Sequence, residues 1–389
     1  MKQVLPETNV LNSIISFAKK CFSNPQFKQA KKYLTGLITL PKKSISSISA
    51  ASVVKQNQSS LNRFLTKAEW DEKQLEDRYT KKIQHTFGRE KASLVIDDSL
   101  SKKTGKHIAE TQYHKDHSGK GYIFGHQIVT ALVKVREKTF PLFPKLYSKK
   151  TQSKIEFAKG LISFADEKLR LKEVIMDSWY MSVELIKECL KRGLDVIGCV
   201  KSNRTAYFKA NEKEKLSKYY QSLKKKDFTT FMVDDAMYKI HERIVRMKHI
   251  GFVKLLISRE WNEDKKKWSR PFYLISTNTE KSAVQIIRTY AERWSIETFH
   301  RDIKQNLGLE AYQVRGRQGI TRHLILVVLA YAVLKFWTCL QNVMWTIGEV
   351  IRYIQGRTFD DLVITIVEEP DLQKRRILAE PFISKNARV

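Results

Sequence analysis

The most informative stretch of this chain is YAERWSIETFHRDIK, residues 290–304. Its apolar residues recur at the spacing of an amphipathic helix, which predicts one long helix over residues 282–307. At about 100° per residue, five polar residues fall on one face of that helix: Tyr290, Arg293, Glu297, Arg301 and Lys304. The opposite face carries three apolar residues that can pack on a sheet: Ile296, Phe299 and Ile303.

The polar face of this helix suits a phosphate group. Arg293 and Lys304 can pair with phosphate oxygens, and Tyr290 can donate a hydrogen bond. Glu297 would repel DNA unless a divalent metal ion bridges it to the phosphate. Alternatively, the face is merely solvated, and Glu297 pairs with Arg293 and Arg301. The helix by itself leaves both interpretations open.

The composition predicts a polyanionic partner. The 389 residues include 71 Lys and Arg against 41 Asp and Glu, which gives a formal net charge of +30. Such a field favours nucleic acid as the partner. An anionic membrane surface is the rival, but the cations are spread along the whole chain rather than gathered on one amphipathic helix.

Several features predict a soluble protein of a reducing, cytoplasmic compartment. The four cysteines form no CxxC pair, which argues against zinc ribbons and a disulfide framework. The first residues lack the uninterrupted apolar core of a signal peptide. The apolar run LILVVLAYAVL, residues 324–334, stops at Lys335 and is too short to span a bilayer, so we expect a buried core helix.

The chain divides into a helical and a mixed part. Residues 1–90 have helical apolar spacing, and we expect them to bind DNA. Segments rich in strand formers then alternate with helices, which predicts an α/β core over residues 91–203 and 279–340. Short strands broken by lysine-rich turns predict a β-rich insertion over residues 204–278. Residues 341–389 form a C-terminal helical or tail region.

Within the helical part, residues 44–65 (SISSISAASVVKQNQSSLNRFL) read as two short helices around a polar turn. This pattern is compatible with a helix-turn-helix DNA reader. Such patterns are common by chance and more often belong to a plain helical bundle, and both interpretations remain open.

Two predicted strands end in carboxylates. Asp97 and Asp98 end one apolar strand, and Asp177 ends another in VIMDSWY. Side chains at the carboxyl ends of strands project into the crevice at that edge of a sheet. Together with Glu297 they make a three-carboxylate group, whose oxygen ligands suit Mg²⁺ or Mn²⁺ rather than zinc. Aspartate also begins many turns, so each strand end is weak on its own.

These residues resemble the bacterial insertion-sequence transposases of the DDE superfamily, in the branch with the YREK signature. That signature is Tyr, two residues, Arg, three residues, Glu, six residues and Lys, and the chain meets it at four positions: Tyr290, Arg293, Glu297 and Lys304. The first family aspartate matches Asp97, although Asp98 leaves the register open, and the second matches Asp177. The resemblance covers about residues 93–337.

The resemblance implies an RNase H-like catalytic core interrupted by the β-rich insertion. It also implies an enzyme that nicks DNA at the ends of its element and transfers the 3′-OH ends to target DNA by two-metal-ion phosphoryl transfer. Asp97, Asp177 and Glu297 would be catalytic and hold two Mg²⁺ ions, with Mn²⁺ tolerated. Three signature residues would bind DNA phosphates, Tyr290, Arg293 and Lys304, and we expect the same of Arg301 because it continues their face of the helix.

The resemblance further implies double-stranded DNA partners, namely the terminal inverted repeats and the target. A homodimer in the DNA complex, no membrane and a bacterial, nucleoid-associated cytoplasmic location follow by analogy. Three rivals remain: a non-transposing nuclease, a transposase-derived DNA-binding regulator, and a structural basic protein that coats nucleic acid.

Two further groups of side chains have ordinary explanations. Four histidines cluster in residues 107–126, but no helical HxxxH or cysteine partner supports zinc, so we expect surface or DNA-facing side chains: His107, His114, His117 and His126. Three aromatics flank the proposed acids and could stack on an unpaired base, with core packing as the default: Trp179, Tyr180 and Trp294. The basic stretch VRGRQG, residues 314–319, could contact a phosphate backbone or be a plain loop.

Overall fold

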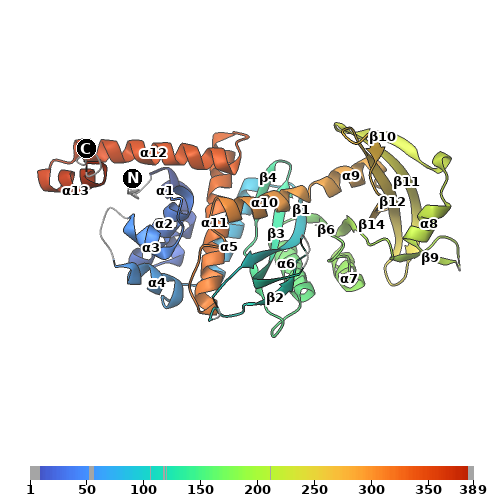
Figure 1. The fold of residues 1–389 in the computed structure, drawn as a ribbon, viewed down its shortest axis with the longest axis horizontal. Coiled ribbons are helices and arrows are strands. Elements are labelled where there is room, and N and C mark those ends of the chain that lie inside the picture. Colours follow the sequence, from blue (N-terminus) through green and yellow to red (C-terminus); the bar gives the residue numbers. More distant parts are fainter. Residues whose placement is uncertain are drawn as a thin grey trace.

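The computed structural model describes residues 9–383, except residues 52–56, 106, 117–118, 120 and 211. The molecule is elongated, with the N-terminal helices toward one end and the β-rich insertion at the other (Figure 1). The α/β core lies between them (Figure 1). Helix α12 extends along the end that holds the N-terminal helices (Figure 1).

The N-terminal region is helical, as predicted. Its elements are α1 (Asn9–Ile15), the 3₁₀ helix η1 (Ser16–Cys21), α2 (Asn24–Thr39), α3 (Ile45–Ala50), α4 (Gln58–Thr66) and α5 (Glu72–Phe87). Ser23 and Gln26 form a capping box at the start of α2, and the Asp71 carboxylate caps α5. The two short helices expected in residues 44–65 are α3 and α4, which pack on each other. The turn between them lies outside the described residues at 52–56.

The core sheet is built around β1 (Ala92–Lys102). β1 pairs antiparallel with β3 (Tyr122–Val135) on one side and parallel with β6 (Leu171–Met176) on the other. β6 in turn pairs parallel with β7 (Asp195–Cys199). Three short strands pair with β3: β2 (Gln112–Lys115), β4 (Lys138–Pro141) and β5 (Lys145–Tyr147). Helices α6 (Lys154–Lys168) and α7 (Val183–Lys191) make the parallel crossovers.

The insertion shares one sheet with the core. β14 (Phe272–Ser276) pairs antiparallel with β7, which gives the strand order β2-β3-β1-β6-β7-β14-β12-β11-β8-β9. The remaining elements are β8 (Thr205–Tyr207), β9 (Lys213–Lys215), α8 (Leu216–Ser222), η2 (Lys225–Asp227), β10 (Thr229–Val233), β11 (Ala236–Met247), β12 (Gly251–Asn262) and β13 (Lys267–Trp268). Strand pairing therefore runs across the expected boundary of the insertion.

The prediction of one long helix over residues 282–307 is wrong, because two helices occupy this segment. α9 (Ala283–Ala291) and α10 (Trp294–Gln305) are joined by tighter i→i+3 bonds, such as Arg293 N–H to the Tyr290 carbonyl at 3.0 Å. α9 packs on β7 and β10, whereas α10 packs on β1 and β3, so the two helices serve different parts of the sheet. The predicted apolar face is confirmed, since Ile296, Phe299 and Ile303 are buried.

Helix α11 (Arg317–Gln341) is the central support of the fold. It contacts α1, α2 and α4 on one side and β4 on another, and it is followed by α12 (Ile347–Glu368) and α13 (Leu372–Ile383). It contains the predicted core helix of residues 324–334, although it continues beyond Lys335. In the described chain it is the one helix long and apolar enough to cross a membrane, but 83% of its apolar window is buried inside the protein.

Two buried side chains of α11 fasten the N-terminal helices to it. The Arg322 guanidinium donates to the Glu72 carboxylate at 2.6 Å and to the Ala68 and Trp70 carbonyls. His323 Nδ1 lies 2.7 Å from the Tyr33 hydroxyl of α2. Burial lowers the pKa of His323 to about 3, so this imidazole is neutral in the folded protein at physiological pH.

We expect His323 to make the folded protein sensitive to acid. Its pKa lies at about 3 in the fold against an ordinary 6.5, so only the unfolded chain binds this proton as the pH falls from 6.5 toward 3. The free energy of unfolding should therefore fall less steeply over this window in His323→Gln than in the wild type, by urea denaturation. His107→Gln, which removes an exposed imidazole, is the matched control. Equal slopes in wild type and His323→Gln would contradict this account.

Candidate active site

Asp97 and Asp177 lie at the same edge of the parallel strands. Ile96 of β1 pairs with Met176 of β6, and these are the last paired residues before the two aspartates. The expectation that Asp97 ends its strand is wrong, because β1 continues to Lys102 by pairing with β3. What ends at Asp97 is the parallel pairing, and this brings its carboxylate toward Asp177.

The Asp177 side chain is fixed by the turn that follows β6. Its Oδ1 accepts hydrogen bonds from the backbone N–H groups of Trp179 at 2.9 Å and Tyr180 at 3.2 Å. Such a turn is the local structure that aspartate favours after a strand. One carboxylate oxygen is thereby held, and Oδ2 makes no such bond.

The electrostatic surroundings of Asp97 oppose its negative charge. Burial, followed by the nearby Asp177 carboxylate, raises the pKa of Asp97 to about 7, although the Asp98 N–H and the Arg293 guanidinium act in the opposite direction. A carboxyl group in this state gains from an added cation, because the cation would relieve both the burial and the repulsion. Such perturbed carboxylates cluster at functional sites.

Asp98 is engaged by a separate network. Its Oδ1 lies 2.9 Å from Lys154 Nζ and accepts from the Tyr180 hydroxyl at 2.8 Å, while the Gln127 amide donates to Oδ2. Consecutive residues of a strand point to opposite faces, so only one of the two aspartates can face the acid group. This network favours Asp97 as the first acid. Sequence reasoning missed Lys154 and Gln127, and it named Tyr180 as an aromatic near the acids but not as a partner of Asp98.

Arg293 lies between two of the predicted acids. Its guanidinium donates to Glu297 Oε1 at 2.5 Å, and Nη1 lies 3.7 Å from Asp97 Oδ2. The i,i+4 pairing of Glu297 with Arg293 is therefore present. The solvated-face interpretation also expected Glu297 to pair with Arg301. Among the described residues that pair is absent, and Arg301 is exposed. Arg293 thus supplies positive charge between Asp97 and Glu297.

Tyr290 and Lys304 complete the polar face at different distances from the acids. The Arg293 guanidinium lies 5.7 Å from the centre of the Tyr290 ring, and burial raises the pKa of this phenol, which stays protonated. Lys304 is half-buried, and burial lowers its pKa while its charged neighbours are Glu310 and Lys102. The structure therefore gathers Tyr290, Arg293 and Glu297 near the aspartates and leaves Lys304 to one side.

A family model described as "Transposase DDE domain" matches residues 88–333, which is more than half of the chain. The chain belongs to this family. A second model, described as "DDE superfamily endonuclease", matches residues 19–143. No curated protein matches.

The transposase is also similar to a solved structure, the cryo-EM structure of the piggyBac transposase synaptic complex with hairpin DNA. The two chains share 13% sequence identity with a TM-score of 0.51, and the match covers 97% of this chain and 80% of the other. Together with the helical N-terminal region and the mixed sheet, this likeness confirms the predicted fold class, an RNase H-like core interrupted by a β-rich insertion.

The carboxylates of the candidate site have the chemistry to bind a divalent cation, but their present positions do not form a metal site. Within the described ranges, no group of three or more His, Cys, Asp or Glu side chains is placed to hold a metal ion. Asp97, Asp177 and Glu297 offer carboxylate oxygens, which Mg²⁺ and Mn²⁺ prefer. The raised pKa of Asp97 indicates a deficit of positive charge, and the Arg293 guanidinium occupies the space next to Asp97 and Glu297.

The expectation of surface or DNA-facing histidines is wrong for two members of the cluster. His126 is fully buried, and its ring nitrogens lie 2.5 Å from the Tyr312 hydroxyl and 2.7 Å from the Ala109 carbonyl. His114 is also buried, whereas His107 is exposed and His117 lies outside the described residues. Strand β3 carries His126 inward, a placement that the local spacing could not reveal.

The three aromatics near the acids behave differently from one another. Tyr180 is buried and packs in the core, which is the default that the sequence predicted. Trp179 and Trp294 remain exposed, at 39% and 65%, and Lys154 Nζ lies 3.7 Å from the centre of the Trp179 ring. The stretch 314–319 is only partly a loop, because α11 begins at Arg317, whose guanidinium pairs with Glu110 at 3.2 Å.

We expect neutralisation of the two neighbouring aspartates to have opposite effects on stability. In the metal-free transposase at pH 8, Asp97→Asn removes a carboxylate that is buried beside Asp177, so the melting temperature should rise by a few degrees. Asp98→Asn removes the partner of Lys154 and should lower the melting temperature. Differential scanning calorimetry in EDTA makes this comparison. A fall in both variants would contradict the assignment of the two networks.

Proposed function

We propose that this chain is the transposase of a bacterial insertion element, in the YREK branch of the DDE superfamily. It would nick DNA at the ends of its element and join the freed 3′-OH ends to target DNA. The observation that carries the proposal is that Arg293 joins Asp97 to Glu297 while Asp177 lies beside Asp97, in a chain that belongs to the DDE transposase family.

Asp97, Asp177 and Glu297 are the residues that would hold two Mg²⁺ ions. Bound divalent cations supply Lewis-acid activation of the nucleophile and neutralise charge at the scissile phosphate. The protein contributes the shape of the site, because the Trp179 and Tyr180 N–H groups fix Asp177 and the sheet fixes Asp97. Glu297 must exchange its bond with Arg293 for this role.

The cations and the phenol of the polar face would position DNA. Arg293, once released from the carboxylates, can pair with phosphate oxygens through its planar fork of N–H donors. Tyr290 remains protonated and can donate to a phosphate oxygen. Arg301 and Lys304 lie further along α10, where they would contact neighbouring phosphates.

The proposed chemistry has two successive steps on phosphorus. Water attacks the scissile phosphodiester, the P–O3′ bond breaks, and the products are a 3′-OH and a 5′-phosphate. The 3′-OH then attacks a phosphodiester of the target, which forms a new P–O3′ bond and releases a 3′-OH of the target strand. Neither step requires a covalent bond between DNA and the enzyme.

The partners would be the terminal inverted repeats and the target DNA, bound by a homodimer in the bacterial cytoplasm at the nucleoid. The net charge of +30 supports a nucleic acid ligand. The similar piggyBac transposase structure is itself a complex with hairpin DNA. Residues 1–90 would contribute to DNA binding, and the polar groove between α3, α4 and residues 311–316 is one place for it.

The direct test is cleavage of a labelled duplex that carries the element's end, in Mg²⁺, in Mn²⁺ and in EDTA. We expect nicking that leaves a 3′-OH in either metal and none in EDTA. Glu297→Gln should lower the rate by at least about a hundredfold while DNA binding persists, since one charge-stabilising group is lost. Glu263→Gln, at an exposed hairpin position, is the matched control and should cut at the wild-type rate.

Other outcomes of this cleavage experiment would favour one of the three rival functions. Binding without cutting, in any metal and with authentic ends, would identify a DNA-binding regulator and refute the proposed enzyme. Nicking without joining to target DNA would identify a non-transposing nuclease. Metal-independent binding without sequence preference or cutting would fit a protein that coats nucleic acid.

We also expect Arg293 to compete with the divalent cation for the carboxylates. Arg293→Gln removes a positive charge from beside Asp97 and Glu297, so Mg²⁺ should bind the protein without DNA about tenfold more tightly. The same variant should bind DNA ends less well, because a phosphate partner is lost. Calorimetric titration of Mg²⁺ measures the first effect. Weaker Mg²⁺ binding in the variant would show that Arg293 supports the metal rather than competes with it.

A further inference from the structure

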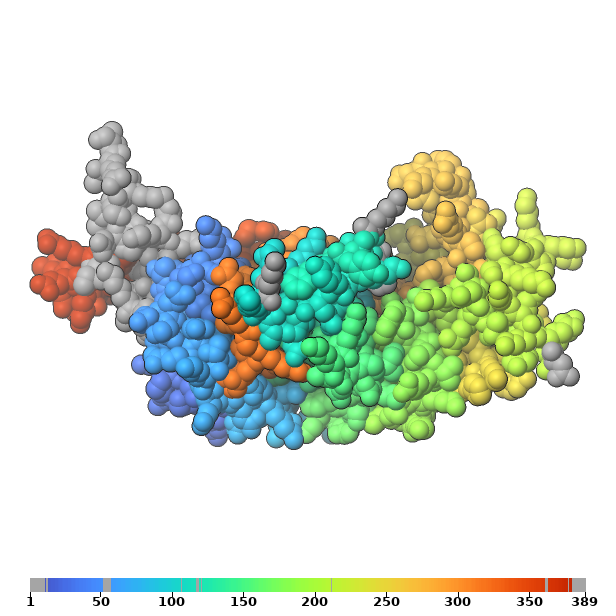
Figure 2. Space-filling view, turned by 60° about the horizontal axis from the view of Figure 1, so that its bottom comes forward, coloured from blue at the N-terminus to red at the C-terminus, as the bar shows by residue number. Residues whose placement is uncertain are grey.

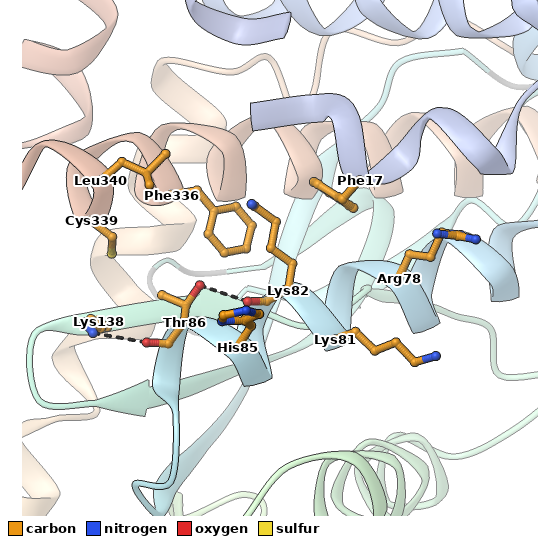
Figure 3. Close-up of a pocket in the computed structure, with 10 residues that line it drawn as sticks. All are labelled: Phe17, Arg78, Lys81, Lys82, His85, Thr86, Lys138, Phe336, Cys339 and Leu340. Atoms are coloured by element: carbon orange, nitrogen blue, oxygen red, sulfur yellow. Dashed lines mark hydrogen bonds between the residues drawn. The ribbon is translucent and has the colours of Figure 1, made fainter. Parts of the chain in front are cut away.

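A second cationic pocket lies apart from the candidate active site. It has a volume of about 580 Å³ and lies between η1, α5, β4 and the C-terminal part of α11 (Figure 3). Five basic side chains and an apolar wall line it, together with Thr86: Arg78, Lys81, Lys82, His85, Lys138, Phe17, Phe336, Cys339 and Leu340. It shares no residue with the acid group of Asp97, Asp177 and Glu297. Figure 2 shows the surface of the elongated molecule from one side, with the N-terminal helices toward one end and the β-rich insertion at the other.

The positive charge of this pocket is not balanced locally. No carboxylate is among the residues that line it. The three carboxylates of α5 that could have balanced it pair with other parts of the fold: Glu72 with Arg322, Glu76 with Lys145, and Asp77 with Lys168. Across the described chain, Arg78, Lys81, Lys82 and Lys138 have no carboxylate within ion-pair distance. Four permanent cations therefore face one hollow without a counter-charge.

The packing of Lys82 and Arg78 leaves both charges available. Lys82 Nζ points toward the two rings of the apolar wall, 5.0 Å from the centre of Phe336 and 5.8 Å from that of Phe17 (Figure 3). The Arg78 Nε is buried and has no hydrogen-bond partner among the described residues. This nitrogen is closed to solvent, so an anion in the pocket would have to pair with the terminal nitrogens of the guanidinium.

Helix capping accounts for only one of these cations. Lys138 Nζ donates to the Thr86 carbonyl at 3.1 Å, in the last turn of α5, where free carbonyls attract positive charge. Lys81, Lys82 and Arg78 make no such bond to the end of the helix. Their side chains remain available to a ligand from outside the chain.

We propose that this pocket holds a backbone phosphate of bound DNA, away from the position at which DNA is cut. The cations pair with the phosphate oxygens, and the wall of Phe336 and Leu340 accommodates the adjoining sugar. The pocket lies beside the β3–β4 hairpin, which pairs with the first residues of β1, whereas Asp97 lies further along that strand. A duplex that reaches the pocket therefore contacts the protein at a second place, away from the acid group. The choice of DNA as the ligand rests on the proposed function.

The first test measures the salt dependence of binding to a fluorescent duplex of mixed sequence. Each phosphate contact contributes about 0.9 to the slope of log affinity against log salt concentration. Lys81→Gln/Lys82→Gln removes cations that hold this one phosphate, so it should lower the magnitude of the slope by up to about 0.9, and binding should weaken at low salt. The control Lys209→Gln/Lys218→Gln removes the same charge from exposed positions of the insertion, outside the pocket, and should keep the wild-type slope.

The second test uses two half-buried thiols of the wild-type protein, so it does not depend on the folding of a variant. Cys339 lines the pocket, whereas Cys199 lies near Asp177 and Arg293 at the candidate active site. Alkylation of each thiol by iodoacetamide is followed by mass spectrometry, with and without the duplex. We expect the duplex to slow alkylation of Cys339.

The outcomes separate the pocket from the proposed function. Protection of Cys339 but not Cys199 would support the pocket while the proposed cutting site fails. Protection of Cys199 alone, or equal slopes for the pocket variant and its control, would overturn the pocket. The alkylation experiment is also repeated with inorganic phosphate in place of the duplex, at the same ionic strength. If phosphate protects Cys339 and saturating duplex does not, the pocket binds a small free anion and the DNA proposal is wrong.

Discussion

The repulsion between Asp97 and Asp177, held at the ends of adjacent parallel strands, is the constraint on which this site depends. The sheet register fixes the backbone of Asp97, and two backbone N–H groups hold the Asp177 carboxylate, so the two acids stay at the same edge of the sheet. Burial strengthens the repulsion and raises the pKa of Asp97 to about 7. Arg293 lessens it, and the same deficit of positive charge makes the site receptive to a divalent cation.

The rest of the fold keeps these groups in place. α10 presents Arg293 and Glu297 because its apolar face is buried against β1, β3 and α11. α11 in turn holds the N-terminal helices through Arg322 and His323. The pairing of β14 with β7 makes the insertion a continuation of the core sheet, so the two parts share apolar residues such as Ile197 and Leu274. Positioning of the acids is therefore a property of the whole scaffold.

Local patterns could predict part of this arrangement. Apolar runs gave the strands that precede Asp97 and Asp177, and helical spacing gave the buried face of α10. The strand period also implied that Asp97 and Asp98 face opposite ways, but choosing between them required the position of Lys154 and Tyr180. The break between α9 and α10, the β14–β7 pairing and the burial of His126 depend on contacts distant in sequence. No local pattern encodes such contacts.

The central proposal is that Asp97 and Glu297 exchange Arg293 for divalent cations, which Asp177 also holds, when DNA is bound. The most direct measurement is anomalous diffraction from crystals of the protein with a duplex end and Mn²⁺. The account predicts anomalous peaks in contact with the Asp97 and Asp177 carboxylates, with Arg293 turned from Glu297 toward a phosphate. Mn²⁺ bound at Asp98 instead, or an intact Arg293–Glu297 pair beside a DNA-loaded site, would contradict it.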